Sequence, residues 1–504
     1  MEMTKGNLWK QIWIYSVPLM LTNLLQVFFN LADIAVVGKF AGPISLGGVG
    51  STTLLVTLTT GFLIGMSNGV NTLTALYIGS GEKDREVKTV HTGFVLCVGT
   101  GVGVLALGIV FANSILRLLG TKPELFAEAS VYFKIYMLGS PALAIYNYGN
   151  AVLSAAGDTK KPLKYLTIAG VINVFLNLVF VIGFKMQASG VALASILSQY
   201  VSALLILSAL LKTTEAYRLE PLRIFIGKKN CKGRQKFPIK AIPEQASQMI
   251  GAASLEQKSR MTGPASHEQA SVNVESAVDG KIAARILRIS IPAAFQYSLF
   301  AVANLVVQSA VNSFNHITVE GNSAAMNADA VIYDMMAAFY TACSSFIAQN
   351  YGAGNKERIK KTYLITTFYS FMVGLVLGGL LFIFKNQFLF LFTSDQQVIQ
   401  QGAIRISIMG LSYCVSALMD NATAGARGLG KTLVPTIAII FGSVVYRVLW
   451  IVTVFAYFRT LQSLYLLYVT AWIFTAIIGN TYFVGVYRKI PVKKEPKHYT
   501  VSNS

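Results

Sequence analysis

The residues of this sequence that are best suited to chemistry lie inside a long apolar segment near its start. Asn23, Gln26, Asn30 and Asp33 follow one another at intervals of three, four and three residues. At about 100° per residue of an α-helix, their side chains fall within an arc of roughly 80°. The spacing predicts a helix with one polar stripe that ends in a carboxylate and with apolar side chains around the rest of its surface.

A carboxylate in such a helix is a candidate ion-binding group. An ionised side chain is costly in a bilayer, and acids within membrane segments usually face a polar interior. Burial disfavours the charged form of a carboxyl, so Asp33 could take up a proton on one side of a membrane and release it on the other. Its stripe partners could hydrogen-bond to it or bind a hydrated cation. The alternative is a structural carboxyl that fixes this helix against its neighbours.

This interpretation requires that the rest of the chain also spans a membrane. Of the 504 residues, 54% are hydrophobic and 13% are charged, whereas a soluble protein carries about 25% charged residues. Apolar runs of about 20 residues recur along the chain, which is the length of a membrane-spanning helix. We therefore expect an all-α integral membrane protein with twelve spans, at residues 12–37, 44–70, 90–112, 128–155, 163–184, 187–211, 284–314, 323–350, 362–385, 401–426, 433–456 and 462–487.

Lysine and arginine are unequally shared between the two sides that these spans define. The side with both termini also holds "GEKDREVK", "DTKKPLK", "NKERIKK" and the tail "RKIPVKKEPK". The positive-inside rule places that side, and both termini, in the cytoplasm. The same asymmetry explains the net charge of +20 without a nucleic-acid partner.

The chain also contains a duplication. "GSGEKDREVKT" at 79–89 and "GAGNKERIKKT" at 352–362 are identical at six of eleven positions, with an offset of 273. The same offset pairs Gly157 with Gly430 and Thr159 with Thr432, while an offset of 274 pairs Pro18 with Pro292. We expect two parallel six-helix lobes, an arrangement found in secondary transporters. The predicted organisation is a lobe at 1–212, a partly flexible cytoplasmic linker at 213–281, a second lobe at 282–487 and a basic cytoplasmic tail at 488–504.

These residues carry a family resemblance that extends over nearly all of the chain outside the linker. "NLLQVFFNLADIAVVGKF", "LSAAGDTKKP", "INVFLNLVF", "GAGNKERI" and "ARGLGKTLVP" resemble the bacterial branch of the multidrug and toxic compound extrusion (MATE) family. The resemblance implies two lobes in a V and efflux of organic, often cationic, drug-like compounds driven by inward movement of H⁺ or Na⁺. It also implies a multi-pass protein of the bacterial plasma membrane, which we expect to be a monomer.

The resemblance extends the cation site beyond Asp33, the position where MATE proteins commonly carry an N-lobe acid. Asn173 and Asn177 lie four residues apart on one helical face, and Asn147 and Ser195 match positions that line the family's N-lobe cavity. Family members often have a second Asp at the position of Asn177, and this chain departs from that pattern. Our hypothesis is that these five side chains surround one cation.

The second half has its own charges within predicted spans: Asp329, Asp334, Asp420 and Arg447. A lone arginine at such depth needs a partner, and we predict a direct or water-bridged Asp334–Arg447 pair. Its role is structural, or Asp334 is a second proton site. A further polar face of the seventh span could line the cleft, and aromatic and methionine clusters could contact substrate. The polar face consists of Gln296 and Asn304, and the substrate contacts are Tyr146, Tyr333, Met336 and Phe339.

Other functions have less support in the sequence. A flippase or exporter of a lipid-linked saccharide precursor or a polar metabolite shares the architecture, but a pyrophosphate needs a strongly basic cavity, for which only Arg447 and Arg405 qualify. An enzyme is disfavoured because the histidines and cysteines have no metal-ligand or nucleophile spacing. No G-x-x-x-x-G-K-[ST] motif for ATP occurs, and we expect no cofactor besides the coupling ion.

Overall fold

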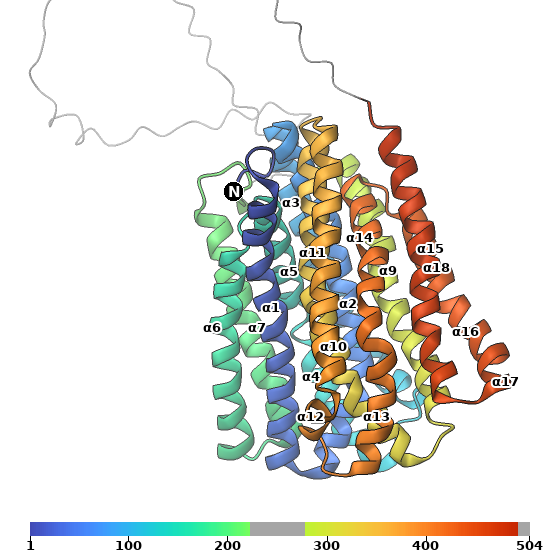
Figure 1. Ribbon diagram of the computed structural model, residues 1–504. Helices are drawn as coiled ribbons and strands as arrows, with labels where there is room; N and C mark the ends of the chain where they lie inside the picture. The colour runs from blue at the N-terminus through green and yellow to red at the C-terminus, as the bar shows by residue number, and fades with distance from the viewer. Residues whose placement is uncertain (222–277, 492–504) are drawn as a thin grey trace, which may run out of the picture.

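A computed structural model describes residues 1–221 and 278–491 as an assembly of long helices (Figure 1). The predicted linker at 213–281 and tail at 488–504 fall largely on residues outside these ranges. The first half contains α1 (Leu8–Val36), η1 (Val37–Ala41), α2 (Gly42–Ser80), α3 (Lys83–Leu118), α4 (Pro123–Met137), α5 (Ser140–Ala155), α6 (Lys160–Leu178), η2 (Val179–Gly183) and α7 (Gln187–Lys212).

The second half begins at α9. It contains α9 (Gly280–Val311), α10 (His316–Gly352), α11 (Lys356–Ile383), α12 (Lys385–Phe390), α13 (Gln396–Met409), η5 (Gly410–Ser412), α14 (Tyr413–Gly428), α15 (Leu433–Ile440), η6 (Phe441–Val445), α16 (Tyr446–Trp450), η7 (Ile451–Phe455), α17 (Ala456–Phe458) and α18 (Leu461–Arg488).

The expected all-α membrane architecture is confirmed. Within the described ranges, ten stretches are long and apolar enough to cross a membrane. The first of them, Leu8–Ser80, joins two predicted spans, because α1 continues through η1 into α2 and Gly42 turns the chain with a φ of +85°. The fourth predicted span is divided between α4 and α5, and neither piece reaches 18 residues. The number of twelve spans therefore stays a prediction.

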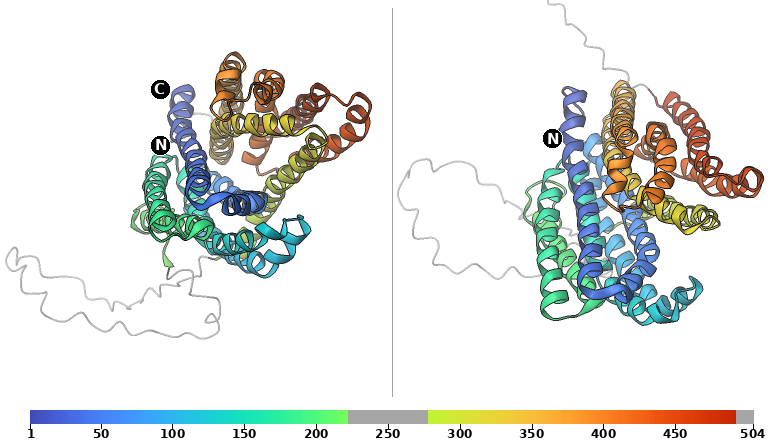
Figure 2. Two further views of the ribbon diagram at one scale, coloured as in Figure 1. Left: turned by 90° about the horizontal axis from the view of Figure 1, so that it is seen from below. Right: turned by 60° about the horizontal axis from the view of Figure 1, so that its bottom comes forward.

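Two helical lobes stand side by side. Viewed from the end of the bundle, the helices of the first half gather on one side and most of those of the second half on the other (Figure 2). Helices α10, α11, α13, α14 and α18 share one apolar core, and α2, α3, α5 and α7 share another. The first helix of each half crosses to the opposite lobe, because α1 packs on α10 while α9 packs on α2.

The backbone confirms the internal repeat at its turns. Gly81 and Gly354, which are 273 residues apart, follow α2 and α10 with φ of +73° and +74°. Gly157 and Gly430, at the same offset, have φ of +86° and +71°. Glycine adopts this left-handed conformation without a steric penalty. The glycines that revealed the duplication in the sequence are therefore the residues that end equivalent helices.

A pair of side-chain hydrogen bonds repeats as well. The Thr159 hydroxyl donates to the carbonyl oxygen of Tyr15 at 3.0 Å, and the Thr432 hydroxyl donates to that of Arg288 at 3.2 Å. Both donors and both acceptors are separated by 273 residues. The two bonds attach the turn after α5 to α1 and the turn after α14 to α9. The first helix of each half is thus held in the same way.

The lobes touch most closely where α2 and α10 cross. A Cβ at Gly79 would lie 1.9 Å from the carbonyl oxygen of Gln349, and a Cβ at Gly352 would lie 2.0 Å from that of Leu76. The two glycines are equivalent in the repeat, so the crossing is reciprocal. This end of the bundle, which we call the terminal face, also holds the N-terminal residues and the end of α18, where Lys356 donates to the carbonyl oxygen of Ile490 at 2.6 Å. There, Arg358 donates to the carbonyl oxygens of Met3, Lys5 and Gly6.

This crossing predicts the effect of a single methyl group. Gly79→Ala should destabilise the protein by about 1–3 kcal/mol, because backbone atoms must move to admit the side chain. Gly103→Ala is the matched control, since nothing lies within 4 Å of its added Cβ and alanine is the better helix former. Thermal unfolding of both variants in the same detergent measures the difference. Equal stability of the two would show that the crossing is not tight.

Candidate functional site

Asp33 lies near the end of α1, where this helix packs against α6. A glycine permits the close approach: a Cβ at Gly170 of α6 would lie 1.7 Å from the ring of Phe29. Phe29 is four residues before Asp33, one helical turn away. The small residue in α6 therefore lets α1 bring its carboxylate to the polar side chains of α6 and α7.

Each carboxylate oxygen of Asp33 has one neutral donor. The Asn177 amide donates to Oδ1 at 2.5 Å, and the Ser195 hydroxyl donates to Oδ2 at 2.9 Å. Asn173 joins the group, because its Oδ1 accepts from Asn177 at 3.3 Å and its amide donates to Ser195 at 3.4 Å. Asn173, Asn177 and Ser195 are all buried. The structure thus brings together four of the five side chains of the predicted cation site.

Asn147 and the remaining stripe residues do not join this group. Asn147 is buried in α5, and its amide nitrogen has no hydrogen-bond partner. Asn23 instead donates to the backbone carbonyl of Asp334 at 2.7 Å, in the opposite lobe. Gln26 is half-buried and Asn30 is exposed. In the described structure, the predicted hydrogen bonds from these stripe residues to Asp33 do not form.

The Asp33 cluster has the composition of a site for a proton or a hard cation. Its side chains carry five oxygens: the two of the carboxylate, the amide oxygens of Asn173 and Asn177, and the hydroxyl oxygen of Ser195. The Asn177 Oδ1 is buried and has no hydrogen-bond donor, which is uncommon for a buried polar atom. Among the described residues, no Lys, Arg or His forms an ion pair with Asp33. Oxygen ligands around one uncompensated carboxylate suit a small monovalent cation.

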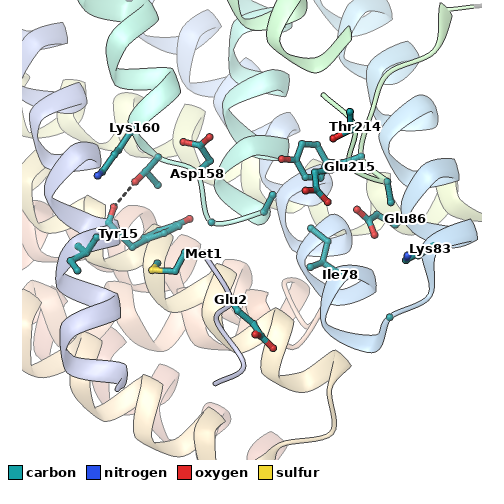
Figure 3. A pocket seen from close by; sticks show the side chains of 17 residues that line it. Met1, Glu2, Tyr15, Ile78, Lys83, Glu86, Asp158, Lys160, Thr214 and Glu215 are labelled. Carbon is teal, nitrogen blue, oxygen red and sulfur yellow. Dashed lines mark hydrogen bonds between the residues drawn. The ribbon is translucent and has the colours of Figure 1, made fainter. Parts of the chain in front are cut away.

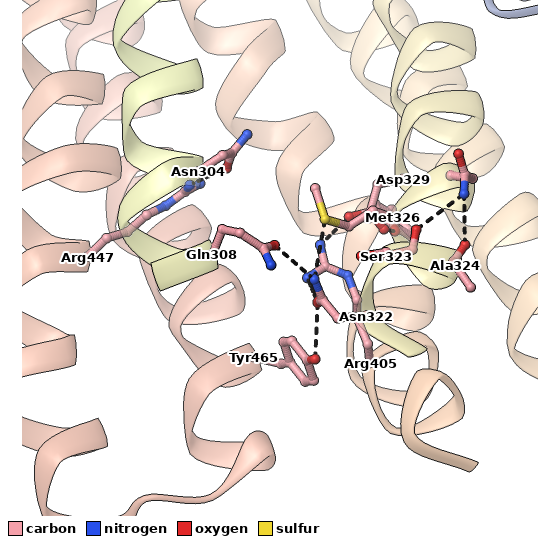
Figure 4. Close-up of polar contacts among 12 residues, drawn as sticks. Asn304, Gln308, Asn322, Ser323, Ala324, Met326, Asp329, Arg405, Arg447 and Tyr465 are labelled. Carbon is pink, nitrogen blue, oxygen red and sulfur yellow. Dashed lines mark hydrogen bonds and ion pairs between the residues drawn. The ribbon is translucent and has the colours of Figure 1, made fainter. Parts of the chain in front are cut away.

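The second lobe contains a charged network that the sequence did not predict. The guanidinium of Arg405 on α13 forms an ion pair with Asp329 on α10, and the Tyr413 hydroxyl donates to the same carboxylate. Arg405 also donates to Asn322 Oδ1 at 2.9 Å, as does the Tyr465 hydroxyl at 3.1 Å (Figure 4). Arg405 is 2% exposed, so this acid compensates a charge that is almost fully removed from solvent.

The predicted direct Asp334–Arg447 pair is wrong. Arg447 donates to Asn304 Oδ1 at 2.8 Å, and no carboxylate of the described residues pairs with it. Asp334 contributes its backbone carbonyl to Asn23. The reason is that α16 packs against α9 and α18, whereas Asp334 lies on the part of α10 that faces α1. The acid that does form a pair is Asp329, about one and a half turns earlier on α10.

The remaining predicted residues occupy packed positions. Gln296 and Asp420 are each 6% exposed, and each has a side-chain oxygen without a hydrogen-bond partner. Met336 and Phe339 are fully buried, and Tyr146 is 3% exposed. Tyr333 is partly buried, and its ring lies against that of Tyr340 at 6.2 Å. The surroundings of Tyr146, Met336 and Phe339 favour packing roles, and substrate contact by these residues stays a prediction.

A separate hollow of about 870 Å³ opens at the terminal face (Figure 3). The turns around Gly81 and Gly157 and the segment after α7 line it, with Glu2, Glu86, Asp158 and Glu215 as acids and Lys83 and Lys160 as bases. No residue of the Asp33 cluster or of the Arg405 network borders it. This hollow is therefore distinct from both intramembrane groups.

The chain is similar to known proteins in family, in sequence and in structure. Residues 18–179 and 292–452 match the MatE family model, one match in each lobe. The chain is 28% identical to the "Probable multidrug resistance protein YpnP" of Bacillus subtilis, over 71% of this chain and 68% of that protein. It is 23% identical to the "FAD transporter" of Shewanella oneidensis, over 79% of this chain and 77% of that protein.

The fold has close counterparts among solved structures. One is the outward-facing conformation of a multidrug resistance MATE family transporter of the MOP superfamily. It superposes with a TM-score of 0.81 at 20% identity and covers 98% of each chain. At this level of identity, the likeness shows that the fold is shared.

The ion pair of the second lobe predicts a large loss of stability. Asp329→Asn should destabilise the protein by about 3–5 kcal/mol, because it leaves the buried Arg405 charge without its acid. Adding Arg405→Gln should recover part of the loss. Asp84→Asn is the control, since its ion pair with Lys88 is at the surface and is worth about 0–1 kcal/mol. Thermal unfolding of the single and double variants gives the coupling, and strictly additive losses would contradict the pairing.

Proposed function

The chain belongs to the MatE family of multidrug efflux transporters, and from this premise we propose that it is a secondary active exporter of small organic compounds. The proposed drive is antiport with H⁺ or Na⁺, by alternating access between the two lobes. The proposed location is a bacterial plasma membrane, with the terminal face and both termini in the cytoplasm. The lysines and arginines of the terminal turns support this orientation.

The Asp33 cluster is the observation that carries the proposal. Both carboxylate oxygens accept hydrogen bonds from side chains of α6 and α7, so the ionised carboxylate fastens α1 to its own lobe. A proton or Na⁺ on Asp33 would replace part of this bonding, because a protonated oxygen no longer needs the Ser195 donor. The occupancy of the site would thereby change how firmly α1 is held.

Helix α1 connects this site to the seam between the lobes. Its first half packs on α10, where Tyr15 donates to Ser345 Oγ at 3.1 Å and to the carbonyl of Ser154 at 3.1 Å. Further along α1, Asn23 donates to the Asp334 carbonyl. A shift of α1 relative to α6 would therefore be felt in contacts of both lobes. Alternating access needs such a coupling between ion occupancy and the lobe interface.

Two substrate classes are compatible with this device. An organic, drug-like cation follows the family's multidrug efflux function. A polar metabolite is the second candidate, because the second lobe buries two arginines, Arg405 and Arg447, and only Arg405 is paired with an acid among the described residues. A FAD transporter among the relatives is consistent with that alternative. A lipid-linked saccharide would need the same basic groups.

Substitution of the carboxylate tests the coupling directly. Asp33→Asn keeps the size of the side chain and removes its charge, so we expect folding to persist and gradient-driven export of ethidium to fall by about tenfold or more, the factor that corresponds to one lost charge-assisted contact. Asp84→Asn, at an exposed surface pair, is the control. Uptake into inverted membrane vesicles is the measurement. Wild-type activity of Asp33→Asn would discard the site.

The coupling ion is resolved by imposing one gradient at a time. In vesicles with either a proton gradient or a sodium gradient, wild-type protein should accumulate ethidium under at least one of them. The Asp33→Asn variant should respond to neither, because the only acid of the cluster is gone. Accumulation by wild-type protein that is independent of both gradients would refute antiport.

A further inference from the structure

Arg447 has unusual surroundings for a charged residue. It lies on the short helix α16, between the wide π-helical turns η6 and η7. Its side chain is 2% exposed, and its Nε has no hydrogen-bond partner. One terminal nitrogen donates to Asn304 at 2.8 Å, and the guanidinium lies 4.6 Å from the centre of the Tyr468 ring. Such interruptions of a helix are often found at functional sites.

The charge of Arg447 is not compensated by an acid. Asp329, the nearest candidate in the network, is already paired with Arg405. The aromatic ring of Tyr468 lies against the Arg447 guanidinium. Arg405, a second cation, lies 5.3 Å from the centre of the same Tyr468 ring. Arg405, Arg447 and Asp329 together carry a net charge of +1, and such a buried charge is costly without a counterion.

The hydrogen bond of the Arg447 guanidinium goes to an exposed residue, Asn304. Asn304 is exposed although Arg447 is buried. One turn further along α9, Gln308 accepts from the Asn322 amide at 3.1 Å, and Asn322 accepts from Arg405 at 2.9 Å. Figure 4 shows Gln308 between the Arg447–Asn304 contact and the Arg405 network. The amide of Gln308 thus lies between the exposed Asn304 with its Arg447 contact and the buried Arg405 network.

We propose that Arg447, Asn304 and Gln308 form an anion-binding site that takes a carboxylate or phosphate group of the exported compound. A guanidinium with a free Nε–H can bind either group through two parallel hydrogen bonds. The side-chain amides supply further donors after rotation. The inference rests on the proposed function only in assigning the anion to an exported compound. A positive charge elsewhere on that compound remains compatible with the site.

The position of the site in the repeat supports this assignment. Asn304 corresponds to Asn30 at the offset of 274, so Arg447 lies beside the second-lobe counterpart of the polar stripe that ends in Asp33. The first lobe presents an uncompensated carboxylate, and the second lobe presents an uncompensated guanidinium. A coupling cation and a substrate anion would therefore be attracted to different lobes and would not compete for one group.

The phosphate of a lipid headgroup would present the same chemistry as a soluble phosphate. We assign the site to a soluble organic anion, because the polar groups beyond Asn304 are the amides of Gln308 and Asn322. The acyl chains of a lipid need an apolar surface, and exposed apolar side chains neighbour Asn304 and Arg447 in the sequence, among them Leu305 and Val448. An experiment must therefore compare soluble anions with an anionic lipid.

The test uses the full chain, purified in a neutral detergent. Thermal stability is measured with sodium benzoate, with sodium phenyl phosphate and with sodium chloride at the same ionic strength, and separately with added phosphatidylglycerol. For wild-type protein, at least one of the two organic anions should raise the unfolding temperature above the chloride control. For Arg447→Met, the half-saturating anion concentration should rise by about tenfold or more, and Arg447→Lys should lie between the two.

Stability without anion separates binding from structure. Because Arg447→Met removes an uncompensated buried charge, its unfolding temperature in chloride should equal or exceed that of wild-type protein. The control Arg459→Gln removes an exposed cation of the same lobe and should keep the full response to anions. The inference would be overturned if Arg447→Met were less stable than wild-type protein in chloride and still responded to the organic anions as wild-type protein does.

Two further outcomes are decisive. Protection by phosphatidylglycerol alone would assign the site to a lipid and overturn the substrate assignment. Wild-type protein that binds neither organic anion, yet exports ethidium in exchange for H⁺ or Na⁺, would overturn this inference and leave the proposed function intact. If the protein binds the anions through Arg447 but shows no gradient-driven export, the proposed function is overturned and the anion-binding site at Arg447 stands.

Discussion

The cost of placing a charge among membrane-spanning helices governs the chemistry of this protein. A charged side chain there needs polar partners that replace water, and the structure meets this need in three ways. Asp33 receives neutral donors from Asn177 and Ser195. Arg405 receives an acid. Arg447 receives an amide and the face of an aromatic ring. These groups differ in the sign of the charge that has no oppositely charged partner, and therefore in the ion that each can bind.

The duplicated scaffold explains how these charges can be linked to movement. Equivalent threonines fasten α1 and α9 to the turns of their own halves, while both helices pack on the opposite half. The symmetry belongs to the turns and the helix crossings, where glycine and threonine are retained at a constant offset. The polar groups are not symmetric, since the first lobe has an acid among amides and the second has two arginines. A symmetric frame thus carries different chemistry in each lobe.

The sequence allowed parts of this picture to be predicted, for physical reasons. Helical periodicity places Asn173 and Asn177 on one face, and the repeat is visible because glycines with positive φ cannot be replaced freely. The pairing of charges could not be obtained in this way, because it depends on which helices touch. Depth along the helices was the basis for pairing Asp334 with Arg447, and depth alone is not sufficient, because it does not show which helices are neighbours. Helices α10 and α13 both start at the end of the bundle opposite the terminal face. Asp329 lies about 20 Å from the start of α10, and Arg405 lies about 14 Å from the start of α13. Asp334 lies about 27 Å from the start of α10.

The amide at Asn177 bears on how many charges one cycle can carry. A second carboxylate at this position would lie within hydrogen-bonding distance of Asp33, and the pair could hold two protons or a divalent ion. With Asn177 in its place, the cluster has one negative charge, which a single proton or Na⁺ neutralises. Under the proposed function, one monovalent cation therefore enters per cycle at this site. An anionic group at Arg447 would neutralise the group formed by Arg405, Asp329 and Arg447 in the same manner, so that this group and the Asp33 cluster would each be neutral when loaded and charged when empty.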